Sequence, residues 1–271
     1  MFKKSVDIVF NIAEGASGRN REAQVPVILE LFRIPYVGSD GLTQALTLDK
    51  FMTKKILLSS DINTPNYMHI KNTVSSINTS TLNFPLIVKP RWEGSSKGIT
   101  GKSRVENRHQ LVKQVNHIIK VYKQPVLIEE FITGAEYTVA IIGNGDSVRT
   151  YIYKVVFGSD KPTGDEYFLS ENVENDEVCY ISADDLDLKL KKLLHSLAFK
   201  TYESVGCLDF GRVDIRIDKS GQPYVLEINP LPSLNIKDTF GILAIDTGMG
   251  YTKMIQQILI SACKRLKIKN P

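Results

Sequence analysis

The sequence predicts a mixed α/β (α+β) protein, built from short buried strands, amphipathic helices and two β-hairpins. Apolar runs of strand length, such as Val6–Ile12, end in loops that contain glycine or proline. Apolar residues at helical spacing recur, most clearly over Leu186–Tyr202. Two pairs of β-rich runs surround short polar turns, one pair within 137–156 and the other within 213–228. The order of elements along the chain is therefore mixed α and β.

The first expected element is a strand over Val6–Ile12, which ends in a glycine-containing loop. This run contains Asp7 and Asn11, and no small-residue cleavage site follows it, so it is interpreted as a buried strand and not as a signal peptide. An amphipathic helix is expected over Glu22–Phe32, where Pro26 is tolerated only near the first turn.

A brief strand at Ile34–Val37 and a longer helix over roughly Leu42–Ser59 come next. A Gly-Ser-Asp turn separates the two elements. Ser39 or Asp40 can cap the helix, because short polar side chains accept hydrogen bonds from the free N–H groups at a helix start.

The middle of the chain is expected to hold two strands, a helix and another strand. The strands Asn66–Ile70 and Pro85–Pro90 lie on either side of a loop rich in serine, threonine and asparagine at Thr73–Asn83. Apolar residues recur at helical spacing over Arg108–Tyr122. A proline ends this helix before the strand Val126–Glu130.

The C-terminal half alternates hairpins with helices. The first hairpin joins Tyr137–Ile142 to Ser147–Val156, and the helix Leu186–Tyr202 follows, with a glycine just beyond it as a stop. The second hairpin joins Val213–Ile217 to a strand over 223–228, and a final helix covers roughly Gly250–Leu266.

The composition is that of an ordinary soluble, intracellular protein. Hydrophobic residues make up 42% and charged residues 24%, and the formal net charge is +4. No basic stripe interleaved with aromatics is present, so no nucleic-acid partner is expected. No apolar stretch approaches the length of a membrane span, so no membrane partner is expected either. The basic tail Lys264–Lys269 is interpreted as a solvated helix end.

The three cysteines and four histidines do not form a catalytic or metal pattern. Cys179, Cys207 and Cys263 are scattered, which fits a reducing cytoplasm with each thiol acting as a small buried hydrophobe. The histidines do not cluster, and His195 lies within an amphipathic helix, where a surface or boundary role is expected. No Ser–His–Asp or Cys–His arrangement is indicated.

The second hairpin is the most informative segment for chemistry. Side chains alternate along a strand, so Arg212, Asp214 and Arg216 share one face. If the turn holds an even number of residues, the register brings Asp214 opposite Val225 or Glu227, and Asn229 shares a face with Glu227. Two carboxylates, an amide oxygen and a guanidinium then converge, which suits Mg²⁺ with the arginine placed for a phosphate. The alternative is a solvent face with a salt bridge.

Two further segments point to the same chemistry more weakly. Lys89 ends an apolar strand, so it needs an anionic partner. In the loop after it, Gly94 and Gly98 allow tight curvature, and serines add hydroxyl donors for phosphate, although a plain turn is the alternative. The strand Val126–Glu130 runs into acidic residues, for which the alternative is an edge strand leaving the core.

These segments, taken in order, resemble the ATP-grasp superfamily and, within it, the D-alanine–D-alanine ligase family. The resemblance covers the chain from about residue 7 to its end. It rests on these stretches: Ile34-Pro-Tyr-Val-Gly-Ser39, Leu48-Asp-Lys50, Phe84-Pro-Leu-Ile-Val-Lys-Pro90, Glu93-Gly-Ser-Ser-Lys-Gly98, Ile128-Glu-Glu-Phe-Ile132 with Glu136, and Gly211-Arg-Val-Asp214 with Glu227-Ile-Asn229.

The resemblance implies an ATP-dependent ligase that phosphorylates a carboxylate and lets an amine attack the acyl phosphate. It implies ATP and Mg²⁺ as cofactors, with two ions and Mn²⁺ as a substitute, and a place in peptidoglycan (cell-wall) precursor synthesis. The implied nucleotide-binding residues are Lys50, Lys89, the loop residues Glu93, Gly94, Ser95 and Ser96, the adenine hinge Glu129, Glu130, Phe131 and Ile132, and the ribose-binding Glu136. Asp214, Glu227 and Asn229 are the implied metal ligands, and Arg212 and Ser96 the implied catalytic residues.

The implied fold is an ATP-grasp fold in which two α+β lobes sandwich ATP, preceded by a truncated Rossmann-like (preATP-grasp) remnant. We expect this partial domain at residues 1–45, a central lobe with the phosphate loop at 46–125, and a C-terminal lobe with the metal site at 126–271. The family has further strand–helix units ahead of the first strand, so the chain is expected to begin inside that domain.

Two other departures concern the substrate. The family's Tyr- and Lys-containing loop over the D-alanine site is not recognisable in Phe157–Glu171. Ser233 stands where many members have glycine after the Asn-x-x-Pro turn. Nucleotide chemistry is therefore better supported than D-alanine specificity.

The leading hypothesis is a cytoplasmic enzyme that joins small amino-acid or carboxylate substrates, with D-alanine–D-alanine ligation as the single best choice. A ligase for other amino acids or peptides is one alternative. A truncated ATP-binding protein without turnover of its own is another. A homodimer, and a separate chain that supplies the missing units, are the further partners considered.

Overall fold

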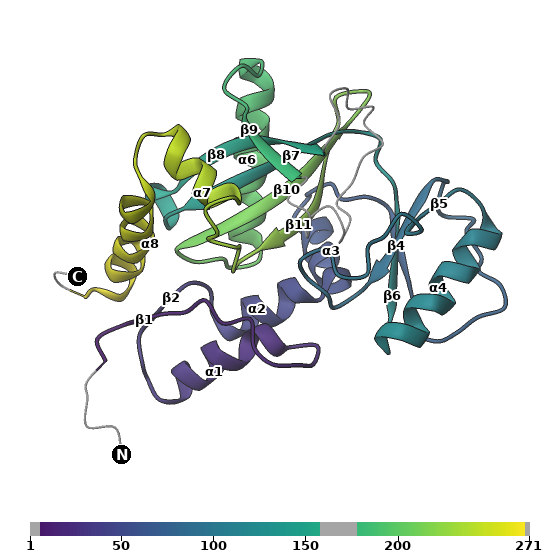
Figure 1. The fold of residues 1–271 in the computed structure, drawn as a ribbon, viewed down its shortest axis with the longest axis horizontal. Coiled ribbons are helices and arrows are strands. Elements are labelled where there is room, and N and C mark those ends of the chain that lie inside the picture. Colours follow the sequence, from purple (N-terminus) through teal and green to yellow (C-terminus); the bar gives the residue numbers. More distant parts are fainter. Residues whose placement is uncertain (1–5, 158–177, 269–271) are drawn as a thin grey trace.

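The computed structural model describes residues 6–157 and 178–268, and it has three parts (Figure 1). A small N-terminal segment lies beneath a five-stranded sheet, and a four-stranded sheet with one long helix lies to one side. The predicted loop Phe157–Glu171 falls almost wholly outside the described residues. The mixed α+β class predicted from the sequence is confirmed.

The N-terminal segment contains a short parallel pair of strands, β1 (Val9–Phe10) and β2 (Tyr36–Val37). Between them a 3-10 turn (Arg21–Ala23) leads into helix α1 (Gln24–Leu31). Both predicted strands and the predicted helix are present, although each is shorter than the sequence suggested. Pro26 lies in the first turn of α1, where its missing N–H costs nothing.

The single helix expected over Leu42–Ser59 is two helices, α2 (Gly41–Leu48) and α3 (Lys50–Ser59). Asp40 caps the first, as predicted, by accepting from Thr43 N at 2.8 Å. Asp49 interrupts the run with non-helical dihedrals (φ −84°, ψ 85°) and caps α3 by accepting from Met52 N. The prediction was wrong because tertiary ion pairs of Asp49, described below, outweigh local helix propensity.

The four-stranded sheet has the order β3-β6-β4-β5 and is antiparallel throughout. Its strands are β3 (Tyr67–Ile70), β4 (Leu86–Pro90), β5 (Arg104–Val105) and β6 (Val126–Glu130). Helix α4 (Arg108–Tyr122) packs on one face and has the bounds that its apolar spacing predicted. Strand β6 lies in this sheet, so the sheet continues past residue 125. The proposed division at residues 45 and 125 itself remains a prediction.

Alternation along β4 and β6 determines which side chains can reach a ligand. Leu86 and Val88 face the core under α4, as do Val126 and Ile128. The intervening residues therefore point to the opposite face of the sheet. Lys89, next after Val88, and Glu129, next after Ile128, both point to this opposite face. Glu129 pairs with Ile87 across the ladder.

The five-stranded sheet has the order β11-β10-β7-β8-β9 and is also antiparallel. It consists of β7 (Gly134–Ile142), β8 (Arg149–Phe157), β9 (Val178–Ser182), β10 (Phe210–Asp218) and β11 (Pro223–Asn229). A 3-10 turn (Gly145–Ser147) closes the predicted β7–β8 hairpin, and the second predicted hairpin is β10–β11. Both hairpin predictions are confirmed.

Helices cover both faces of this sheet (Figure 1). Helix α6 (Leu188–Ser204) packs on the face that carries Val139 and Val213. Helices α7 (Thr239–Asp246) and α8 (Tyr251–Leu266) pack on part of the other face, against Ala140 and Phe210. The rest of that second face is left for the site.

Within residues 6–157 and 178–268, three elements were not predicted: β5, β9 and α7. Strand β5 has two residues, too few to give a period-2 pattern. Helix α7 has eight residues, most of them apolar, so its sequence gives no amphipathic signal; an Asp238 cap defines its start.

Two other expectations from the sequence were wrong. Cys179 is exposed on edge strand β9, whereas Cys207 and Cys263 are buried as expected. Arg265 of the basic tail is not a solvated helix end, because its guanidinium pairs with the fully buried Asp209 at 2.6 Å. A buried carboxylate needs a charged partner, and α8 supplies it.

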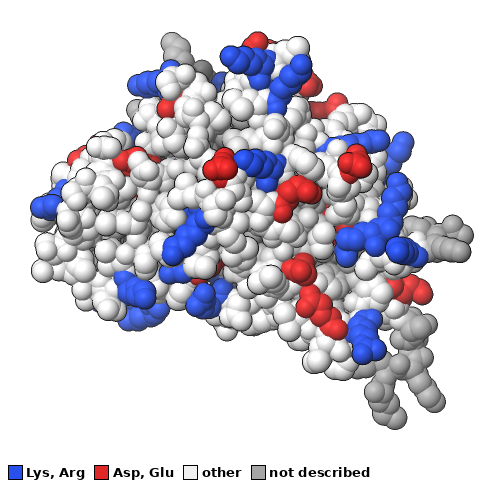
Figure 2. Space-filling model, turned by 180° about the vertical axis from the view of Figure 1, so that it is seen from behind, with Lys and Arg blue, Asp and Glu red and all other residues white. Residues whose placement is uncertain are grey.

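No helix in the described ranges is long and apolar enough to cross a membrane. On the face seen from behind, basic and acidic side chains are interspersed (Figure 2).

Candidate active site

Residues of both sheets meet around a cavity of about 390 Å³. Lys89 and Glu129 reach it from the four-stranded sheet, and Asp214 from the five-stranded sheet. Every residue predicted for the site lines this cavity: Lys50, Lys89, Glu93, Gly94, Ser95, Ser96, Glu129, Glu130, Phe131, Ile132, Glu136, Arg212, Asp214, Glu227 and Asn229. Segments that lie far apart in sequence therefore form one site.

The β10–β11 hairpin brings the predicted metal ligands together. Asp214 pairs with Glu227 across the ladder, and Arg212 pairs with Asn229. An odd number of residues lies between Ile217 and Pro223, so a regular ladder would not pair Asp214 with Glu227. A bulge next to Asp214 shifts the register by one residue and brings Glu227 opposite it. The cross-strand partner predicted for Asp214 is thus reached through a bulge that the sequence did not indicate.

The oxygen atoms at this point suit a hard divalent cation. Two carboxylates from Asp214 and Glu227 and one amide oxygen from Asn229 are the donor set that Mg²⁺ prefers, with phosphate oxygens and waters to complete it. The Asn229 amide nitrogen donates to Asp214 Oδ2 at 3.1 Å, which holds the two side chains together. Among the described residues, no His, Cys, Asp and Glu cluster forms an all-protein metal cage. The donor set fits a metal that arrives with a ligand.

Asp214 is buried and held by three side chains, those of Asn229, Arg212 and Thr138. Arg212 donates to both of its oxygens at 3.1 Å, and Thr138 Oγ1 donates at 2.6 Å. Burial raises the pKa of Asp214, and the nearby Glu227 carboxylate adds to the rise, while Arg212 opposes it. The carboxylate pair therefore has a strong electrostatic demand for a cation.

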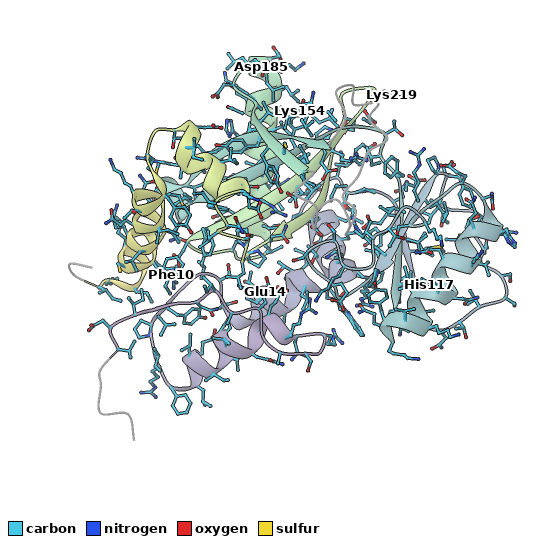
Figure 3. All side chains as sticks on the ribbon, in the orientation of Figure 1. Phe10, Glu14, His117, Lys154, Asp185 and Lys219 are labelled. Carbon is cyan, nitrogen blue, oxygen red and sulfur yellow. The ribbon has the colours of Figure 1, made fainter. Side chains whose placement is uncertain are left out.

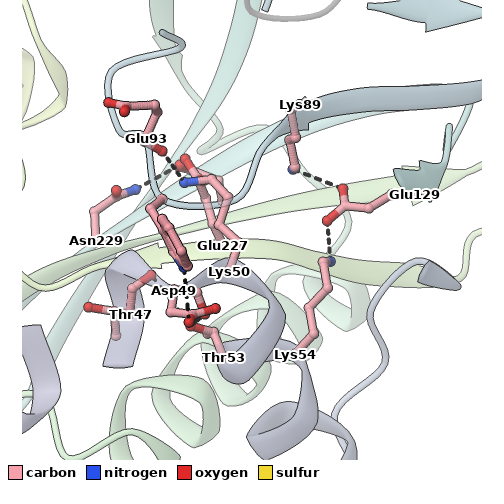
Figure 4. A network of polar contacts seen from close by, with 12 residues as sticks. Thr47, Asp49, Lys50, Thr53, Lys54, Lys89, Glu93, Glu129, Glu227 and Asn229 are labelled. Atoms are coloured by element: carbon pink, nitrogen blue, oxygen red, sulfur yellow. Dashed lines mark hydrogen bonds and ion pairs between the residues drawn. The ribbon is translucent and has the colours of Figure 1, made fainter. Parts of the chain in front are cut away.

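Lys50 meets this demand in the structure (Figure 4). It stands at the start of α3, and its Nζ lies 3.2 Å from Glu227 Oε2 and 2.6 Å from the Glu93 carbonyl. Burial alone would raise the pKa of Glu227, but Lys50, Lys89 and Arg212 outweigh it and lower that pKa. The Glu227 side chain keeps 30% of its surface exposed, so the carboxylate remains open to a ligand.

A second, more deeply buried ion-pair network joins Lys54, Glu129 and Lys89 (Figure 4). The Glu129 carboxylate is 2.8 Å from Lys89 Nζ and 2.9 Å from Lys54 Nζ, and Lys54 also donates to Thr64. All three charged side chains are at least 90% buried. Burial would raise the pKa of Glu129, but the two ammonium groups outweigh it and lower that pKa. For Lys54, burial and the nearby Lys89 lower the pKa to about 8.

Lys54 was not among the site residues predicted from the sequence. It lies one turn after Lys50 on α3, on the same side of the helix, and this i, i+4 spacing was an available signal. It makes Glu129 the bridge between two lysines, so this hinge carboxylate is already engaged before any ligand binds.

The predicted phosphate loop has two tight turns. The Lys97 N–H donates to the Gly94 carbonyl and the Ile99 N–H to the Ser96 carbonyl, each at 3.0 Å. Ser95 and Ser96 have positive φ (50° and 56°), as does Gly98 (81°). A Cβ on Gly98 would lie 2.5 Å from the Pro90 ring, so glycine is required there.

The base of this loop is fixed by charged and amide contacts. Arg91 makes a bidentate pair with Asp49 at 2.6 and 2.7 Å, and Trp92 Nε1 donates to the same carboxylate at 3.1 Å. Gln124 accepts from Trp92 N at 2.7 Å and donates to Glu93 at 2.8 Å. Asp49 therefore links the start of α3, where Lys50 lies, to the start of the loop.

The predicted adenine hinge borders the opposite end of the cavity. The guanidinium groups of Arg104 and Arg216 lie over the Phe131 ring, at 4.6 and 4.8 Å from its centre. Arg216 also donates to the Ile132 carbonyl at 2.9 Å and pairs with Glu136 at 3.0 Å. Burial raises the pKa of Glu136 to about 7, although Arg216 opposes the rise.

Glu130 differs from its hinge neighbours in orientation. Its carboxylate accepts from the Asn66 amide at 2.8 Å and from Asn83 at 2.7 and 2.9 Å. The side chain thus braces two loops of the four-stranded sheet.

This fold is shared by solved structures. A D-alanine–D-alanine ligase from Bacillus anthracis, complexed with ATP, superposes with a TM-score of 0.78, over 98% of this chain and 82% of that one, at 24% identity. A ligase of the same name from Coxiella burnetii superposes with a TM-score of 0.75. The protein therefore has the ATP-grasp fold of these ligases.

Sequence comparison identifies the family. The family model described as the D-ala D-ala ligase C-terminus matches residues 56–260. The D-alanine–D-alanine ligase of Carboxydothermus hydrogenoformans is 31% identical, over 95% of this chain and 82% of its own length. An uncharacterized protein, y4sG, of Sinorhizobium fredii is 35% identical, over 95% of this chain and 75% of its own length. The chain belongs to the D-alanine–D-alanine ligase family, whose members are ATP-dependent ligases.

Proposed function

We propose that this protein joins a carboxylate to an amine at the expense of ATP, through an acyl phosphate, with Mg²⁺ bound to Asp214, Glu227 and Asn229. The observation that carries the proposal is the meeting of these three oxygen ligands with Lys50, Lys89 and Arg212 around one cavity. Bound Mg²⁺ supplies charge neutralisation for the triphosphate, and Mn²⁺ is proposed as a substitute. The ATP-bound Bacillus anthracis relative supports ATP as the nucleotide.

Each set of residues has a proposed task. Glu129–Ile132 border the adenine, and Glu136 accepts hydrogen bonds from the ribose hydroxyls. Lys50 and Lys89 hold phosphate oxygens, and Glu93–Ser96 close over them with backbone N–H groups. Arg212 and the loop residue Ser96, which line the same cavity, stabilise the charge that develops on the transferred phosphoryl group. Catalysis is therefore by positioning and charge neutralisation.

The names of the relatives make D-alanine the first carboxylate to test as the phosphorylated substrate. A place in cell-wall precursor synthesis follows if D-alanine is also the amine. A ligase that uses a different amine is the second candidate, and Asp238, discussed below, is the observation that favours it.

The acyl phosphate is tested by isotope transfer. The carboxylate oxygens of the amino acid are labelled with ¹⁸O, and the released phosphate is analysed by mass spectrometry. One labelled oxygen per phosphate is expected, because the carboxylate oxygen that attacks the γ-phosphorus leaves with the phosphate when the amine displaces it. Amino-acid-dependent turnover that gives unlabelled phosphate would rule out the acyl phosphate.

A further inference from the structure

Strand β10 orders the groups along the cavity. Arg216, Asp214 and Arg212 lie on one face at intervals of two residues, which separates neighbours by about 6.6 Å. Arg216 contacts the hinge at Ile132, and Asp214 belongs to the predicted metal site. Arg212 is therefore the member of this row farthest from the adenine end, and what lies beyond it borders the reacting substrates.

A carboxylate lies directly beyond Arg212. Asp238 Oδ1 is 3.5 Å from Arg212 NH1, and both side chains line the cavity. The same oxygen caps α7 by accepting from Thr239 N at 2.6 Å and from Thr239 Oγ1 at 3.2 Å. A carboxylate held by a helix start in this way cannot swing aside without losing its cap.

Arg212 is consequently neutralised from two sides. Asp214 takes two of its N–H groups, and Asp238 lies against a third nitrogen. Glu14, on the segment after β1, lines the same cavity, and among the described residues no ion pair engages its carboxylate (Figure 3). A substrate carboxylate that approached Arg212 here would meet Asp238 first and be repelled.

We propose that Asp238 determines the class of amine that this ligase accepts: a primary amine whose neighbouring group is neutral or cationic, and not the α-amino group of a free amino acid. This inference rests on the proposed ligation. It restricts the class of amine substrate and makes no change to the proposed identity of the carboxylate that is phosphorylated. The Asp238 carboxylate repels a substrate that carries a negative group next to its amine, and it favours a substrate in which this group is neutral or positive.

The test is a competition between an amino acid and its own carboxamide. With ATP and Mg²⁺, D-alanine and D-alaninamide are supplied at equal concentration, and each further amino acid of a D and L panel is paired with its amide. Only the acid can be phosphorylated, whereas both can act as the amine. The dipeptide and the dipeptide amide differ in mass, so one spectrum gives their ratio.

The wild-type protein is expected to make at least about tenfold more dipeptide amide than dipeptide. This preference should come from a lower KM for the carboxamide than for the free amino acid as the amine substrate. Asp238→Asn keeps a capping oxygen and removes the charge, and it should lower the ratio about tenfold. Asp238→Ser is a second neutral capping variant. Comparison between variants cancels the different basicities of the two amines. Asp187→Asn, which alters the cap of α6, is the matched control and should leave the ratio unchanged.

Two results would overturn the inference: a ratio that favours the free acid, or a ratio that neither Asp238 variant changes. Both leave the ligase proposal intact, because products form. Absence of any amine-dependent product across the whole panel is a separate result, in which the ligase proposal and this inference fail together.

Discussion

The ammonium group of Lys50 lies 3.2 Å from the carboxylate of Glu227, so a predicted phosphate lysine and a predicted metal ligand neutralise each other. The same ammonium donates a hydrogen bond to the Glu93 carbonyl at 2.6 Å. The proposed metal binding at Glu227 and the proposed phosphate binding at Lys50 would therefore separate one ion pair, and would also release the predicted phosphate loop from its contact with Lys50.

Lys50→Met should have opposite effects on metal and nucleotide. Without the competing ammonium, Glu227 binds Mn²⁺ more tightly in the absence of nucleotide, by about tenfold, since about 1.4 kcal/mol corresponds to a factor of ten. ATP binding should weaken, because a phosphate partner is lost. Titration calorimetry of each ligand alone measures both. Equal loss of both affinities would mean that Lys50 does not compete at the metal site.

Glu129→Gln should be strongly destabilising. The change leaves Lys54 and Lys89 buried without their shared counter-charge, which costs about 3–5 kcal/mol of unfolding free energy. The double change Glu129→Gln with Lys54→Met removes one of the stranded charges and should recover part of the loss. Urea unfolding gives both values. A double variant as unstable as the single one would contradict this assignment.

Asp49→Asn should weaken both the fold and nucleotide binding. Asparagine keeps the cap of α3 but loses the charge that Arg91 needs, at a cost of about 2–3 kcal/mol. The loop base then loosens next to Lys50, so the KM for ATP rises. Asp40→Asn, which changes the N-cap of α2, is the matched control and should cost under about 0.5 kcal/mol. Similar losses for the two variants would show that Asp49 acts only as a cap.

Adenosine affinity should depend on pH through Glu136. Burial raises the pKa of Glu136 in the free protein to about 7, and the proposed ribose contact requires the carboxylate. Binding therefore releases a proton below about pH 7, so affinity falls as the pH decreases through this value and is flat above it. Adenosine is used because it carries no titrating phosphate. Calorimetry from pH 5.5 to 8.5 checks this, and Glu136→Gln should remove the dependence.

The chain shows why some features could be predicted and others not. Helix α4 follows from apolar spacing alone, and the shared face of Arg212, Asp214 and Arg216 follows from strand alternation. These signals are local. The helix break at Asp49 is not local, because Arg91 and Trp92, about forty residues later, hold its carboxylate.

The site divides in the same way. Lysines and acids in the order of a known family predicted which residues meet at the cavity. The pairing of Lys54 with Glu129, and of Asp238 with Arg212, depends on how the sheets and α7 pack together. Charges from distant elements are brought together only by the tertiary fold, so sequence spacing does not reveal them.

The proposed ATP-dependent ligation is tested most directly by measuring ADP formation with a panel of D- and L-amino acids and amines. The ligation products are quantified in the same samples by mass spectrometry. We expect turnover that requires both a carboxylate and an amine, with one ADP for each C–N bond formed. Glu227→Ala should lose this turnover, by about a hundredfold or more, while the folded structure is retained by circular dichroism. Tight ATP binding with no substrate-dependent ADP formation, or full activity of Glu227→Ala, would contradict it.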